Sequence, residues 1–127
     1  MTVATTDPGK KAMYQFSYAE VLDETPKGAR ERERQAIDRS IELLQQADRA
    51  GARSREAIEA VLFVRRLWGY LIEDLAKPEN DLPQGLRAEL ISIGLWIMRE
   101  AEQIRLETST NFKGLIEVST AIRDGLQ

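Results

Sequence analysis

The chain has 127 residues, a formal net charge of −3 and neither cysteine nor histidine. This length suits a single domain with a hydrophobic core of its own. Without cysteine and histidine there can be no disulfide, thiolate or imidazole metal site, or Ser-His catalysis, so we expect no enzyme activity, no cofactor and no small-molecule substrate. No apolar run approaches the length of a membrane span, so we expect no membrane insertion.

The first 25 residues divide into two parts. Residues 1–12 are polar and predict a disordered tail ahead of a single domain over residues 13–127. A short helical arm is expected next, capped by Ser17 and ended by Pro26. This arm has more apolar side chains than a free tail should carry, which predicts that it packs on the domain or binds a partner. These side chains belong to Tyr14, Phe16, Tyr18, Val21 and Leu22.

Residues 29–50 predict the first long helix, and Gly51 is its expected stop. Its first turns, "ARERERQ", are charged all round and are expected to stand in water. Arginines here and in the following turn are the best candidates for binding RNA, although the alternating glutamates cancel much of their charge. The candidates are Arg30, Arg32, Arg34, Arg53 and Arg55.

Residues 54–76 predict the central helix, with Ser54 as its N-cap. Apolar residues recur in a 4-3-4-3-4 pattern, which is a heptad seam typical of a bundle interior. The seam consists of Ala57, Val61, Val64, Trp68, Leu71 and Leu75. A second apolar stripe predicts that this helix is buried on more than one side, and its apolar surplus would suit a dimer. That stripe consists of Ile58, Leu62, Gly69 and Ile72.

Two further helices complete the pattern. Asp81 is the expected cap of a third helix that runs to about Leu106, with an apolar stripe that begins at Leu86. Ser109 or Thr110 is the expected cap of a final helix that ends at Gly125. The sequence therefore predicts an all-α fold, a compact helical bundle of four main helices with a short N-terminal helical arm.

Glycine stands next to or near tryptophan in both central helices. Gly69 follows Trp68, and Gly94 precedes Trp96 by two residues. Glycine inside a helix costs roughly 1 kcal/mol relative to alanine, so it usually has a packing reason. We therefore predict that the second and third helices cross near Gly69 and Gly94, with the tryptophans filling the space alongside and Trp68 packed in the core. Arg65 and Arg66 adjoin the seam and are expected to extend their charged ends to water or a carboxylate.

Several segments, in a fixed order, carry a family resemblance. They are "YQFSYAEV", "RERERQAIDRSIELL", "LFVRRLWGYLIEDL", "PENDLPQGLRAELISIGLWI", "NFKGLIEV" and "AIRDGL". On these segments, from Met13 to the C-terminus, the chain resembles the FlaF family of flagellar biosynthesis regulatory proteins of alphaproteobacteria. One departure is Ser119, where the resemblance leads us to expect asparagine.

The resemblance implies a cytoplasmic protein with no catalytic, cofactor or metal-binding residues. It implies flagellin as the partner, bound in the manner of a secretion chaperone, so that flagellin synthesis, flagellin export and filament assembly are supported. Two alternatives stay open. The protein could be an RNA-binding translational regulator of flagellin mRNA, or a structural partner of the regulator FlbT.

Overall fold

The computed structural model describes residues 26–126. Four helices account for most of them: α3 (Pro26–Ala50), α4 (Arg55–Ala76), α5 (Gln84–Arg105) and α6 (Phe112–Gly125). Within residues 26–126 there is no β-strand, so the predicted all-α bundle of four main helices is confirmed. The predicted tail and helical arm lie outside the described residues.

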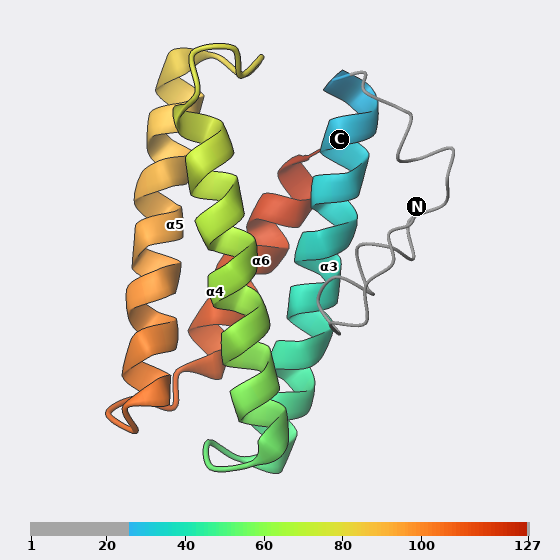
Figure 1. Cartoon of the computed structure of the whole chain (residues 1–127). Helices are drawn as coiled ribbons and strands as arrows, with labels where there is room; N and C mark the ends of the chain where they lie inside the picture. Colours follow the sequence, from blue (N-terminus) through green and yellow to red (C-terminus); the bar gives the residue numbers. More distant parts are fainter. Residues whose placement is uncertain (1–25, 127) are drawn as a thin grey trace, which may run out of the picture.

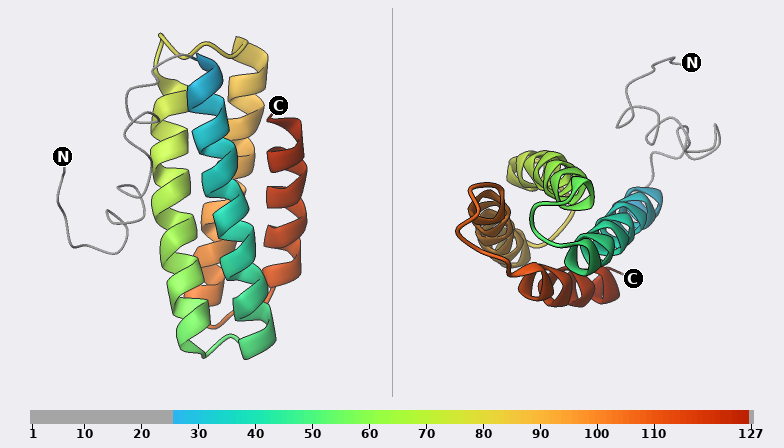
Figure 2. Two further views of the ribbon diagram at one scale, coloured as in Figure 1. Left: turned by 90° about the vertical axis from the view of Figure 1, so that its right-hand side faces the viewer. Right: turned by 90° about the horizontal axis from the view of Figure 1, so that it is seen from below.

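The helices alternate in direction around one core (Figures 1 and 2). We call the end that carries the α3–α4 and α5–α6 loops the lower end, and the end that carries Pro26 and residues 77–83 the upper end (bottom and top in Figure 1). α4 packs on both α3 and α5, whereas α6 packs mainly on α3 and contacts α5 little. Neighbouring helices therefore pack closely around the bundle except between α5 and α6.

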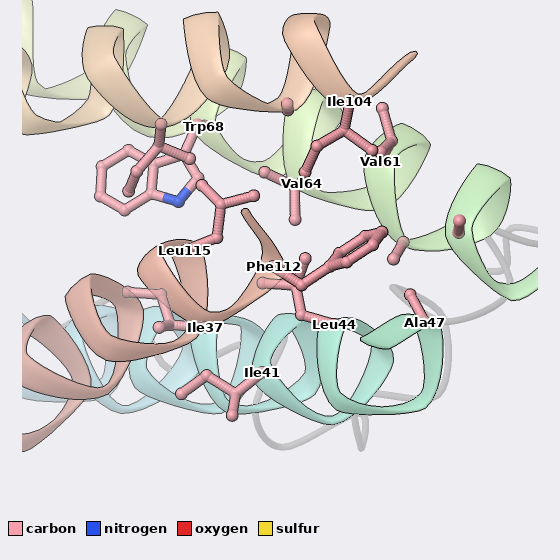
Figure 3. Packing of buried hydrophobic residues seen from close by; sticks show 14 of the residues in the cluster. Ile37, Ile41, Leu44, Ala47, Val61, Val64, Trp68, Ile104, Phe112 and Leu115 are labelled. Carbon is pink, nitrogen blue, oxygen red and sulfur yellow. The ribbon is translucent and has the colours of Figure 1, made fainter. Parts of the chain in front are cut away.

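The heptad seam predicted for α4 faces the core, and its prediction is confirmed. All six of its residues are buried, from Val64 and Trp68 at 1% exposure to Leu75 at 6%. Figure 3 shows side chains of α4, including Trp68, Val64 and Val61, pointing into the same interior as those of α3 and α6. Burial of this apolar surface is the main term that stabilises the bundle.

The start of α3 differs from the prediction in two ways. The helix begins at Pro26 rather than Ala29, so this proline opens a helix where it was expected to end one. A proline suits a first turn because that turn leaves its N–H groups unpaired. Arg30 and Glu33 do not stand in water, since their side chains are only 16% and 15% exposed. This turn faces the 77–83 loop, where Arg30 also pairs with Asp81.

Two of the predicted helix caps are wrong. Asp81 does not cap α5, because the helix begins at Gln84 and Pro83 occupies the N-cap position without a side-chain hydrogen bond. The Asp81 carboxylate pairs with Arg30 instead. Asn111 caps α6 in place of Ser109 or Thr110, and its Oδ1 accepts a 3.0 Å hydrogen bond from Gly114 N.

The start of α4 and the end of α6 agree with the prediction. Ser54 is the N-cap of α4 as predicted, and its Oγ accepts a 3.1 Å hydrogen bond from Ala57 N. α6 ends at Gly125 as predicted. A side-chain cap satisfies one of the N–H groups that a helix start leaves without a backbone acceptor.

The apolar stripe of α5 is buried along only half of the helix. Ile97, Ala101 and Ile104 are buried, but Leu86 in the first turn is 41% exposed and Leu90 is only half-buried. The cause is the direction of α6, which lies along α3 and leaves the upper half of α5 without a helix opposite.

Candidate functional site

The second apolar stripe predicted for α4 lies mostly outside the core, and only Ile72 is half-buried against it. Ile58 is 65% exposed and Leu62 is 48% exposed, and Gly69 is exposed as well. Ala60, absent from both predicted stripes, is buried instead. The prediction of burial is wrong for Ile58, Leu62 and Gly69, because none of the described helices covers that face of α4.

An open groove lies beside this face of α4, at the lower end of the bundle. Its volume is about 540 Å³, and it lies between the first half of α4 and the last turns of α5. The buried residues Ala57, Val61 and Ile104 contribute to its base. Its other apolar lining residues are Ala52, Ile58 and Leu62. We call this hollow the α4–α5 groove.

Four charged residues complete the lining of the α4–α5 groove, and basic groups predominate. They are Arg53, Arg65, Arg105 and Glu107. Arg53 Nε lies 3.0 Å from Glu107 Oε1, across the two loops of the lower end. The groove lining therefore has a formal net charge of +2, on a chain whose total is −3.

Glu102 links the two arginines that α4 and α5 contribute. Its Oε1 lies 3.1 Å from Arg65 Nη1, and its Oε2 lies 2.5 Å from Arg105 Nη2. The hydrogen bond from Arg105 lowers the pKa of Glu102 below its ordinary value. One carboxylate thus serves two guanidinium groups, and Arg65 extends to a carboxylate as the sequence predicted.

The five arginines considered for RNA binding are not brought together. Arg30 and Arg34 lie near the start of α3, where Arg34 pairs with Glu31 at 2.7 Å, and Arg32 lies between them. Arg53 and Arg55 follow the other end of that helix, which is 18 residues beyond Arg32 and therefore roughly 27 Å away. These residues form two separate groups at opposite ends of the bundle.

The aromatic arm predicted to bind a partner lies outside the described residues. This holds for Tyr14, Phe16, Tyr18, Val21 and Leu22 alike. Their role remains a prediction from the sequence.

A second hollow lies at the upper end and is far smaller. Its volume is about 20 Å³, which is room for about one water molecule, and Trp68, Leu90 and Ile122 are among its lining residues. Glu33 also lines it, and burial raises the pKa of this carboxyl above its ordinary value although Arg30 acts in the opposite direction. Asp74 and Asp81 contribute to the same upward shift of the pKa.

We expect Glu33→Gln to change how the free energy of unfolding depends on pH. Because folding raises the pKa of Glu33, the folded chain binds a proton more readily than the unfolded chain above pH 4.5. This group therefore makes wild-type stability fall as pH rises from about 4.5 through the raised pKa. The difference in the free energy of unfolding, Glu33→Gln minus wild type, should therefore increase as pH rises from 4 to 7. Urea unfolding of both proteins at each pH measures it.

Glu31→Gln is the matched control, two residues away on the same helix. The hydrogen bond from Arg34 lowers the pKa of Glu31, so its carboxylate favours the folded state above the ordinary pKa and loses that effect as pH falls. Relative to wild type, Glu31→Gln should therefore become less stable as pH rises. If the free energy of unfolding relative to wild type changed with pH in the same way for both variants, the burial of Glu33 would be contradicted.

Residues 26–126 contain no group of three or more Asp or Glu side chains that could hold a metal ion. In the same range no helix is long and apolar enough to cross a membrane.

The fold and the site together define a small four-helix bundle with an open apolar groove that has a basic rim. The family model described as "Flagellar protein FlaF" matches residues 14–126, so the chain belongs to the FlaF family of flagellar proteins. The match confirms the resemblance seen in the sequence segments. No curated protein and no solved structure shows a significant match.

Proposed function

We propose that this protein acts by binding flagellin and catalyses no reaction. In this role it holds flagellin before export, in the manner of a secretion chaperone, and so supports flagellin synthesis and filament assembly. Such a protein works in the cytoplasm, where flagellin is made, and needs no cofactor.

The α4–α5 groove is the observation that carries the proposal. Ile58 and Leu62 present large apolar surface to solvent there, beside a hollow of about 540 Å³. An exposed apolar patch of this kind commonly marks a protein interaction site. Membership of the FlaF family supports a flagellar partner, and the absence of histidine and cysteine from the sequence favours binding over catalysis.

The test is a titration of the purified protein with purified flagellin at low and at high salt. A protein that binds nucleic acid through six to ten phosphate contacts loses about 10³–10⁵ in affinity between about 50 and 200 mM salt. Apolar contacts in a groove are much less sensitive, so we expect the flagellin affinity to change by less than about tenfold over this range.

Absence of flagellin binding at both salt concentrations would contradict the proposal. Binding of flagellin mRNA with steep salt dependence would then favour the RNA-binding alternative. Co-purification with FlbT, without binding to flagellin or RNA, would favour the structural-partner alternative.

A further inference from the structure

We infer that the α4–α5 groove is the docking site for one amphipathic helix whose apolar stripe is flanked by acidic residues. That this helix belongs to flagellin rests on the proposed function. The position of the site and the charge of its ligand rest on the groove itself.

The apolar surface of the groove has the form that a helix requires. Ile58 and Leu62 are four residues apart, so they lie one above the other on successive turns of α4. Ala57 and Val61 alternate with them as a smaller, buried base. Helix-in-groove recognition uses anchors of the docking helix at spacings of three, four and seven residues, and these would fill the space between Leu62 and Ile104.

The positive charge of the groove rim favours a docking helix with acidic residues on either side of its apolar stripe. Arg65 and Arg105 share the single carboxylate of Glu102, so both guanidinium groups have N–H donors left for a ligand. Arg53 is 86% exposed despite its contact with Glu107. Acidic residues beside the apolar stripe would complement this rim, whereas lysine or arginine there would be repelled.

A second copy of the chain is a poorer occupant. A two-fold symmetric contact places the same surface of each protomer against itself. Two basic rims would then face each other, each with three arginines against the two carboxylates of Glu102 and Glu107, and this opposes the contact. We therefore assign the groove to a different chain.

The test uses two stapled helical peptides that share one leucine stripe and differ only in their flanks, glutamate in one and lysine in the other. We expect the glutamate peptide to bind at least about tenfold more tightly at low salt. Leu62→Asp should weaken its binding by about tenfold or more, since it places a charge among the apolar anchors. The matched control is Leu95→Asp on α5, which is similarly exposed (45% against 48%) and does not line the groove.

Equal binding of the two peptides, binding of neither, or equal effects of Leu62→Asp and Leu95→Asp would overturn the assignment. Circular dichroism and thermal melting show whether each variant keeps its fold. Should Leu62→Asp unfold, Ile58→Asp repeats the measurement at a position that is 65% exposed.

Titrating the same variants with purified flagellin separates the two proposals. If the glutamate peptide binds as expected and flagellin does not, the proposed function fails and the groove assignment stands. If flagellin binds wild type and Leu62→Asp equally well, the assignment of flagellin to this groove is wrong and the proposed function stands.

Discussion

Trp68→Ala is expected to lower the free energy of unfolding by about 3–5 kcal/mol, the usual cost of removing a fully buried large aromatic side chain. Trp68 is 1% exposed and belongs to the core formed by α3, α4, α5 and α6. Domains of this size are stable by about 5–15 kcal/mol, so the variant loses a large part of its stability. Urea unfolding followed by far-ultraviolet circular dichroism measures the loss without depending on tryptophan fluorescence.

Trp96→Ala is the control, because Trp96 is only partly buried against the same core. Its loss of stability should be clearly smaller than that of Trp68→Ala. Trp68→Phe gives an intermediate case. It keeps an aromatic ring and removes Nε1, which is buried and has no hydrogen-bond partner among residues 26–126. Equal losses for Trp68→Ala and Trp96→Ala would contradict the central position of Trp68.

The seam of α4 could be predicted from the sequence because its spacing is a local property. A residue every three or four positions must enter the interior of a bundle, and Ala57 through Leu75 follow that rule. Ser54 was equally predictable, since a side-chain cap acts within three residues of its own position.

Features that depend on contacts between distant residues could not be predicted in this way. Asp81 has the right chemistry for a helix cap, but α5 begins two residues too late for it, and its carboxylate pairs with Arg30, which is 51 residues earlier in the chain. The same ion pair removes Arg30 from water. Asn111 caps α6 in place of two chemically suitable neighbours because the helix begins at Phe112, one residue later than a Thr110 cap would require and two later than a Ser109 cap.

The α4–α5 groove illustrates the same limit at the level of the site. Periodicity identified Ile58 and Leu62 as apolar positions on one face, but it does not say whether another helix covers that face. The answer depends on where α5 and α6 lie. Arg105 and Glu107 were missed because they lie at the end of α5 and in the loop after it, and only the folded bundle brings them beside the first half of α4. The one usable signal was the apolar surplus on α4.

Two glycines that look equivalent in the sequence are expected to respond in opposite directions to alanine. Gly94 is buried, and a Cβ there would lie 2.7 Å from Trp68 Cε3 and 3.1 Å from Ile72 Cδ1. Gly69 is exposed, and a Cβ added there would have nothing within 4 Å. The predicted close approach of α4 and α5 is therefore confirmed at Gly94 and wrong at Gly69.

Gly94→Ala should destabilise the bundle by about 1–3 kcal/mol, because the indole of Trp68 is held by the core and α5 must move outward to admit the methyl group. Gly69→Ala should instead stabilise it by up to about 1 kcal/mol, since alanine restricts the unfolded chain and favours the helix. Urea unfolding of both variants against wild type gives the two signs directly. Stabilisation by Gly94→Ala would show that the two helices are farther apart than the structure places them.

A double-mutant cycle then identifies the origin of the Gly94 effect. Trp68→Ala removes the two indole atoms nearest to the added methyl group, so the cost of Gly94→Ala should largely disappear in that background. The contact with Ile72 remains, and it involves the end of a flexible side chain that can move away. If Gly94→Ala were equally destabilising with and without the indole, the cost would come from the backbone of α5 rather than from its packing on Trp68.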